Sequence, residues 1–116
     1  MIKSQFLAAL GLGLLASVAI AHTQLSSSVP AQDTVVAAAP EELVLTFSTD
    51  VRITALTLTD AAAVSYDLGA LPTSAQQEFS IPVPALAAGY YTVVWRAVGA
   101  DTHVVSGEIH FSVGTS

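Results

Sequence analysis

The sequence contains no cysteine among its 116 residues, and its only methionine is Met1. The absence of cysteine excludes disulfide bonds and every catalytic or metal-binding role of a thiolate. Small exported domains commonly depend on disulfides for stability. If this chain is exported, its hydrophobic core must therefore hold the fold together, with the help of any ligand that binds the native state.

Basic residues are also scarce, since three Lys and Arg residues stand against nine Asp and Glu residues, for a formal net charge of −6. A surface with this excess of negative charge argues against nucleic acid or an anionic membrane as a binding partner. The chain also lacks a glycine-rich phosphate-binding loop.

The first 21 residues have the features of a signal peptide. Lys3 supplies a positive charge, residues 6–21 are uncharged, and the run ends in Ala19-Ile20-Ala21, the small-x-small pattern that precedes a cleavage site. A membrane-spanning helix would need about 20 apolar residues, and this run is shorter. We therefore predict cleavage after Ala21 and a mature domain of residues 22–116, with a formal charge of −7 and no membrane insertion.

Residues after the signal peptide alternate between apolar and polar side chains, and turn signals recur at short spacing. This pattern predicts strands at 25–29, 43–48, 52–59, 64–68, 78–83, 90–98 and 105–113. On the late strands the alternation predicts that Tyr91, Val93, Trp95, Ile109 and Phe111 face the core. Seven short strands indicate an all-β fold, a seven-stranded antiparallel β-sandwich or barrel of Ig-like size.

Only three histidines are present. His22 becomes the first residue after the predicted cleavage, so its free α-amino group and its imidazole can together chelate one metal ion. In the segment Asp101-Thr102-His103, residues i and i+2 of an extended chain point to the same side, about 6–7 Å apart. By contrast, His110 shares its strand face with Glu108 and is expected to be an exposed strand residue.

Each of the first two features has a simpler alternative. Every cleaved signal peptide leaves some residue at the new N-terminus, so a histidine there can occur by chance without binding a metal. An Asp-x-His segment is often only a polar loop. Taken together, however, His22, Asp101 and His103 offer three nitrogens and one oxygen. This ligand set suits tetragonal Cu(II), whereas Zn(II) remains open as a tetrahedral alternative. Pairing of the first strand in parallel with the last would bring His22 and His103 to the same end.

The sequence resembles the CopC copper-resistance proteins over residues 22–116. The resemblance rests on His22, on Ser27-Ser28-x-Pro30-Ala31, on Leu45-x-Phe47-Ser48, and on the segment from Ala88-Gly89-x-Tyr91-x-Val93-x-Trp95-Arg96 to Asp101-Thr102-His103, Gly107 and Phe111. It implies a periplasmic Cu(II)-binding protein with a cupredoxin-like or Ig-like β-sandwich or barrel. It also implies that His22, Asp101 and His103 hold the ion.

Two departures from this family pattern affect the expected chemistry. Some relatives carry a methionine-rich loop that binds Cu(I), whereas this chain has Ser74-Ala75-Gln76-Gln77 in that region, so we expect no Cu(I) site. Some relatives have a glutamate near the copper, where this chain has Thr49 followed by Asp50.

Three functions are therefore compared. The first is a copper carrier or buffer without enzymatic activity, expected to be a monomer, with an inner-membrane copper transport protein as a candidate partner. The second is a metal-free Ig-like interaction module of the cell envelope. The third is an oxidative copper enzyme with an N-terminal histidine ligand, although the chain offers no obvious aromatic platform for a polysaccharide.

Overall fold

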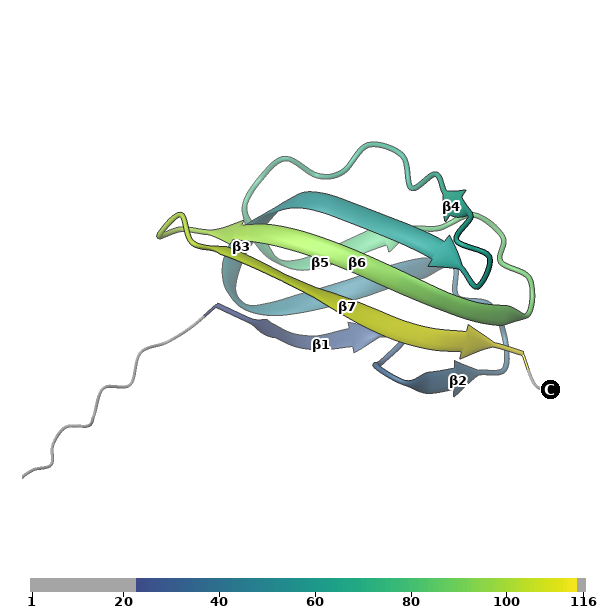
Figure 1. The fold of residues 1–116 in the computed structure, drawn as a ribbon. Helices are drawn as coiled ribbons and strands as arrows, with labels where there is room; N and C mark the ends of the chain where they lie inside the picture. The colour runs from purple at the N-terminus through teal and green to yellow at the C-terminus, as the bar shows by residue number, and fades with distance from the viewer. Residues whose placement is uncertain (1–22, 115–116) are drawn as a thin grey trace, which may run out of the picture.

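The structure is a computed structural model that describes residues 23–114. These residues form seven strands and no helix (Figure 1). The strands are β1 (Leu25–Val29), β2 (Thr34–Val36), β3 (Glu42–Asp60), β4 (Ser65–Tyr66), β5 (Gln76–Pro82), β6 (Gly89–Gly99) and β7 (Val104–Val113). The described part of the chain has no helix long and apolar enough to cross a membrane.

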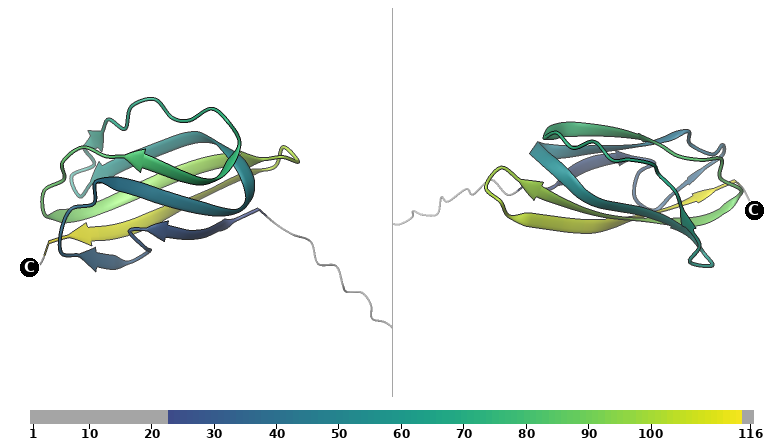
Figure 2. Two further views of the ribbon diagram at one scale, coloured as in Figure 1. Left: turned by 180° about the vertical axis from the view of Figure 1, so that it is seen from behind. Right: turned by 90° about the horizontal axis from the view of Figure 1, so that it is seen from above.

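All seven strands belong to one sheet with the order β1-β3-β6-β7-β2, and β4 and β5 both pair with β3. The sheet curls back on itself, as the three views show (Figures 1 and 2). The side chains inside it are apolar. The all-β sandwich or barrel predicted from the sequence is therefore confirmed, although individual strands differ from the prediction.

The largest difference lies in β3, where one long strand replaces the two strands predicted at 43–48 and 52–59. Its first half pairs with β1 and β5, and its second half pairs with β6. The register shifts between Thr46 and Val51 against β5, and between Ile53 and Ala55 against β6. Such irregularities bend a strand and increase its twist, which lets one strand run through both halves of the curled sheet without a turn.

The parallel pairing of the first strand with the last, which would have brought His22 and His103 to the same end, does not occur. The strand β1 pairs with β3 in the antiparallel sense, and the parallel partner of β7 is β2, a three-residue strand that the sequence pattern did not predict. A strand this short shows no clear alternation of its own, and its pairing depends on residues more than 70 positions later. The predicted strand at 64–68 also shortens, to the two residues of β4.

The core follows the predicted alternation. Every second residue of β6 from Tyr91 to Gly99 is buried, and so is every second residue of β7 from Ile109 to Val113. The Trp95 ring packs edge-on against Phe47 with ring centroids 5.2 Å apart. Gly107 permits this packing, because a Cβ atom there would lie 2.8 Å from the Trp95 ring. The main core residues are Leu43, Leu45, Phe47, Ile53, Leu58, Phe79, Ile81, Tyr91, Val93, Trp95, Ala97, Ile109 and Phe111.

Candidate metal site

The Asp-x-His segment forms the turn of the β6–β7 hairpin, which projects from one end of the barrel (Figure 1). The Gly99 amide donates to the His103 carbonyl at 3.0 Å, and the Thr102 amide donates to the Gly99 carbonyl at 2.9 Å. Thr102 has a φ of 67°, a left-handed conformation that tight turns commonly require. This turn therefore holds residues 101 and 103 in a defined conformation.

Within the turn, the Asp101 carboxylate binds His103 through both of its oxygens. Oδ2 lies 2.7 Å from His103 Nδ1, and Oδ1 accepts a hydrogen bond from the His103 amide at 3.1 Å. These hydrogen bonds, that to the imidazole first, hold the pKa of Asp101 below its usual value. The side chains are 62% and 84% exposed, respectively. Asp101 thus occupies Nδ1, and His103 Nε2 has no partner among the described residues.

The chain that enters β1 is anchored beside this turn. The Thr23 hydroxyl lies 3.0 Å from the Thr49 hydroxyl. The Gln24 amide donates to Ser48 Oγ at 3.0 Å, and the Ser48 amide donates to the Gln24 carbonyl at 2.9 Å. Together these contacts attach residues 23 and 24 to β3, within the segment from Thr46 to Val51 where its register against β5 shifts.

Gly99 lies between the entering chain and the turn. A Cβ atom at this position would lie 3.1 Å from Thr23 Oγ1 and 3.2 Å from Asp101 Oδ1. Both oxygens therefore flank the same point at the end of β6. The predicted ligand His22 lies outside the described residues, but it directly precedes Thr23 in the sequence. Within residues 23–114, no group of three His, Asp or Glu side chains could hold a metal ion.

The structure places His110 in a different environment, on the outer face of β7 as the alternation predicted. Its Nδ1 lies 2.8 Å from the Tyr90 hydroxyl and 3.2 Å from the Thr92 hydroxyl, and its Nε2 lies 3.1 Å from Glu108 Oε1. The Tyr90 ring also stacks on the imidazole. Because both ring nitrogens already have partners, this histidine is a poor candidate for a metal ligand.

The sequence pattern indicated Asp101 and His103 but not the residues that position the chain next to them. Thr49 stood out only as the replacement for a glutamate, whereas in the structure its hydroxyl contacts Thr23. A glycine directly before the Asp-x-His segment, Gly99, could have indicated that another part of the chain lies close to the backbone there. The Thr23–Thr49 contact had no sequence signal, because it depends on the pairing of β1 with β3.

The comparisons with known proteins agree with this fold. The family model of the CopC domain matches residues 25–114. Copper resistance protein C of Escherichia coli is 37% identical over 107 residues, which cover 82% of this chain and 83% of the relative. Copper resistance protein C of Pseudomonas syringae pv. tomato is 29% identical over 128 residues, which cover 96% of each chain.

Solved structures give the same result. The CopC crystal structure from Methylosinus trichosporium OB3b superposes with a TM-score of 0.71 at 28% identity, over 79% of this chain and 93% of that one. PcoC from Escherichia coli, described as a methionine-rich copper resistance protein, superposes with a TM-score of 0.65 at 35% identity, over 80% and 99% of the two chains. With its fold, its Asp-x-His hairpin and a family model matching nearly all of the described domain, this chain belongs to the CopC family.

Proposed function

We propose that this protein binds one Cu(II) ion through His22, Asp101 and His103 and acts as a periplasmic copper carrier or buffer rather than an enzyme. The observation that carries the proposal is that Thr23 Oγ1 and Asp101 Oδ1 both lie next to Gly99, within 3.1 and 3.2 Å of the position of a Cβ atom there. It supports a position for residue 22 beside the hairpin turn, where its amine and imidazole can reach the same ion as His103.

The geometry of the turn supports a defined role for each residue. His103 offers Nε2, because Nδ1 is held by Asp101. A carboxylate that binds the other ring nitrogen orients a metal-ligating histidine and increases its basicity. Asp101 can serve in this way and also turn an oxygen towards the ion, since its side chain is 62% exposed. His22 contributes two nitrogens that close one chelate ring.

The donor set favours Cu(II) over Cu(I). Imidazole, amine and carboxylate ligands suit Cu(II), whereas Cu(I) prefers sulfur. PcoC is described as methionine-rich, but this chain has no cysteine and only Met1, which the predicted cleavage removes. The proposed function therefore includes no tight Cu(I) site.

Export is part of this proposal. Cleavage after Ala21 would give the domain 22–116 and create the α-amino group on which the chelate depends. The mature protein would act in the periplasm as a monomer and exchange copper with a protein such as an inner-membrane copper transporter.

A copper titration on protein recovered from the periplasm tests the proposal. Intact mass should show a chain that begins at His22. Competition against chelators selective for each oxidation state should show one tight Cu(II) per chain and no comparable Cu(I) binding. Tight Cu(I) retention would contradict the ligand assignment, and a native state that copper does not stabilise would favour the metal-free interaction module.

A further inference from the structure

The outer face of β3, β6 and β7 is a regular grid of side chains whose position follows from the strand register. Arg52, Val98 and Val104 form the row nearest the hairpin turn. The next row contains Ala55, Arg96 and Ser106, and the third contains Thr57, Val94 and Glu108. The nine side chains belong to the face opposite the core, and all of them except the half-buried Val98 are exposed.

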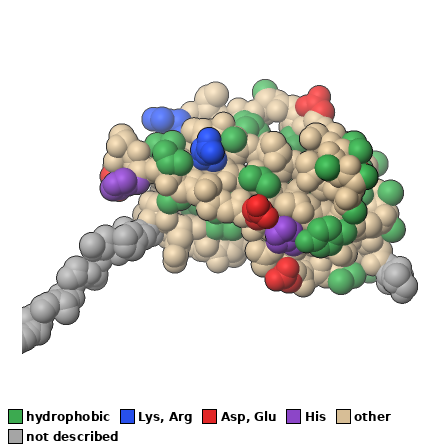
Figure 3. All heavy atoms as spheres, viewed as in Figure 1, with side chains coloured by type: hydrophobic (Ala, Val, Ile, Leu, Met, Phe, Trp, Pro, Cys, Tyr) green, Lys and Arg blue, Asp and Glu red, His purple; other side chains and the backbone are tan. Residues whose placement is uncertain are grey.

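Both arginines of this face lack an acidic partner. Neither Arg52 nor Arg96 takes part in an ion pair in the described part of the chain, where the two ion pairs involve histidines. By the register they are diagonal neighbours on adjacent strands, about 7–8 Å apart. They are also the only Lys or Arg residues between 23 and 114. All the positive charge of the described domain is thus gathered at one place, as the two blue groups in Figure 3 show.

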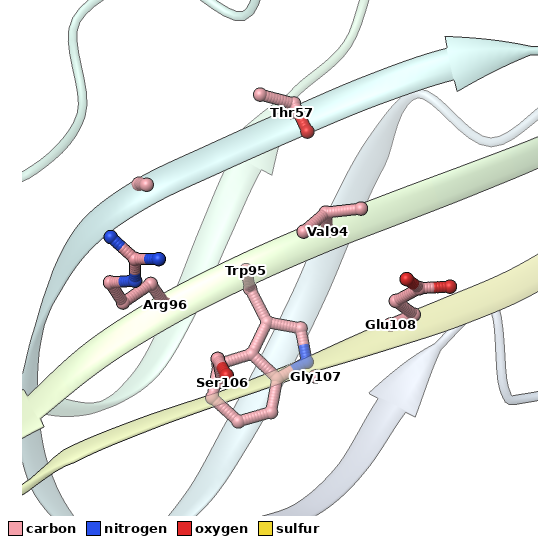
Figure 4. A pocket seen from close by; sticks show the side chains of 8 residues that line it. Thr57, Val94, Trp95, Arg96, Ser106, Gly107 and Glu108 are labelled. Carbon is pink, nitrogen blue, oxygen red and sulfur yellow. The ribbon is translucent and has the colours of Figure 1, made fainter. Parts of the chain in front are cut away.

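The grid also has an apolar groove. A shallow depression of about 310 Å³ runs over its second and third rows, where the small residues Ala55, Ser106 and Gly107 leave room between Val94, Arg96 and Glu108 (Figure 4). Val94 is 41% exposed, and Val104 in the first row is 60% exposed. A groove with exposed valines beside two unpaired guanidinium groups has the mixed apolar and cationic character of a protein-binding surface.

We propose that this arginine face, defined by Arg52, Val94, Arg96, Val104 and Ser106, docks an acidic, partly apolar segment of a partner protein. Guanidinium groups bind carboxylates in a bidentate manner, so two unpaired arginines select a segment that carries at least two carboxylates. The valines and the groove accept the apolar side chains between them.

A protein segment fits this face better than an anionic membrane. A basic residue near an anionic surface contributes about 1 kcal/mol to membrane binding, and two such residues would work against a domain with a net charge of −7. A short acidic segment would contact the arginine face, where Glu108, the one carboxylate that lines the groove, lies 3.1 Å from His110 Nε2. At physiological ionic strength the remaining carboxylates are largely screened beyond about 8 Å, so the local contacts dominate.

The position of the arginine face connects it with the metal site. Its first row ends at Val98 and Val104, the residues that flank the hairpin turn carrying Asp101 and His103. A partner docked here would lie beside the turn. The further inference that this partner gives or receives copper rests on the proposed function, whereas the docking itself does not.

The test uses the mature protein labelled with ¹⁵N and a synthetic extended peptide in which Glu alternates with Val and Thr. The expected result is a set of chemical-shift changes confined to β3, β6 and β7 around Arg52, Val94, Arg96 and Val104. A peptide with Gln in place of Glu should bind at least about tenfold more weakly, as loss of charge-assisted hydrogen bonds requires. The double variant Arg52→Gln/Arg96→Gln should bind the Glu peptide at least about tenfold more weakly than the wild type does.

Three results would overturn the inference. They are shift changes centred elsewhere on the barrel, equal affinity of the Glu and Gln peptides, and binding to phosphatidylglycerol vesicles that exceeds binding to the peptide. A Cu(II) titration of the double variant separates this inference from the proposed function. Unchanged Cu(II) affinity is expected, because neither arginine belongs to the ligand set; failure of the wild type to bind Cu(II) would refute the proposed function and leave the peptide result standing.

Discussion

An aspartate lies in a turn beside each end of β6, and the two carboxylates have different hydrogen-bond partners. Asp60, opposite the start of β6, accepts hydrogen bonds from the amides of Ala62 and Val64 at 2.9 and 3.0 Å and from the Tyr66 hydroxyl at 3.2 Å. Asp101, beyond the end of β6, accepts hydrogen bonds only from His103.

From this difference we infer a structural role for Asp60, whereas Asp101 remains available to the proposed metal site. The donors around Asp60 are backbone amides and a tyrosine, which keep their protons across the neutral pH range, so they tie the turn together permanently. The side-chain partner of Asp101 is an exposed imidazole that can bind a metal ion. The residue type alone does not distinguish the two turns; their hydrogen-bond partners do.

The largest expected effect is on copper affinity at the Asp101 end. His103→Ala should reduce Cu(II) affinity by at least about 100-fold, because it removes the imidazole that is proposed to bind the ion and that Asp101 orients. The fold should be unchanged, since the side chain is 84% exposed. Chelator competition measures the Cu(II) affinity, and far-UV circular dichroism tests whether the fold is unchanged.

Two variants serve as comparisons for His103→Ala. Asp101→Asn should weaken Cu(II) binding less, since an amide oxygen can partly replace the carboxylate without its charge. His110→Ala should leave Cu(II) affinity unchanged, because its ring nitrogens already bind Tyr90, Thr92 and Glu108. Equal losses in His110→Ala and His103→Ala would mean that the metal lies on the outer face of β7.

At the other end, Asp60→Ala should lower the melting temperature without changing Cu(II) affinity. The turn amides and the Tyr66 hydroxyl would lose their common acceptor. Thermal unfolding measures this effect, and Asp67→Ala is the matched control, because Asp67 accepts only the Gly69 amide at 2.8 Å. A larger loss of stability in Asp67→Ala would contradict the structural role assigned to Asp60.

Because of the Asp60 carboxylate, we expect the stability of the protein to depend on pH in the acidic range. Hydrogen bonds, that from the Val64 amide first, lower the pKa of Asp60 from 3.8. A depressed native pKa contributes stability that is present above pH 3.8 and is lost as the pH falls through the native value. Wild-type protein should therefore lose stability more steeply than Asp60→Ala below pH 3.8, as urea unfolding at several pH values can measure.

The hydroxyl of Tyr66, at the same end of the barrel, leads us to expect that stability also depends on alkaline pH. Desolvation, and then the hydrogen bonds and charges of Tyr91 and Asp60, raise its pKa from 10 to about 12. A raised native pKa means that the contribution is complete below pH 10 and is lost between pH 10 and 12. Absorbance titration of the tyrosines should show an ionisation near pH 12 that disappears in Tyr66→Phe; persistence of that ionisation in the variant would contradict its assignment to Tyr66.

A smaller effect is expected at the anchor of the N-terminal segment. Thr49→Val removes the hydroxyl contact with Thr23 at 3.0 Å while keeping the side-chain shape. A hydrogen bond of this kind is worth about 0.5–1.5 kcal/mol, so Cu(II) affinity should fall by about two- to tenfold. Thr57→Val, on the exposed outer face of the same strand, is the control. An equal change of Cu(II) affinity in both variants would show that the Thr23–Thr49 contact does not contribute to copper binding.

The sequence predicted the fold class and the Asp-x-His pair, because alternation and local spacing are visible in one segment at a time. The burial of Tyr91, Val93, Trp95, Ile109 and Phe111 follows from the same alternation. The sequence did not predict the partner of β1, the strand β2 or the continuity of β3. Each of these depends on pairing between distant segments, and register shifts are not visible in a residue pattern.

The same limit applies to the candidate site. Two of its three predicted ligands, Asp101 and His103, are close in the sequence, and the structure brings their side chains together. They meet in a tight turn with Thr102 in a left-handed conformation, not in the extended segment that was expected. The third, His22, was linked to them by a strand pairing that the structure does not contain. In the structure, Thr23 and Asp101 both lie next to Gly99, so the chain that follows His22 still reaches the end of the barrel that carries Asp101 and His103.

The most direct test of the central claim is to add one glycine before His22. The extension leaves the core and the Asp101–His103 hairpin untouched, so the melting temperature of the copper-free protein should not change. The ion would lose the chelate between the amine and the imidazole of one residue. Chelator competition should then show a large loss of Cu(II) affinity, and the electron paramagnetic resonance spectrum should shift. An extended protein with the affinity and spectrum of the processed one would show that His22 is an ordinary first residue and contradict the proposed site.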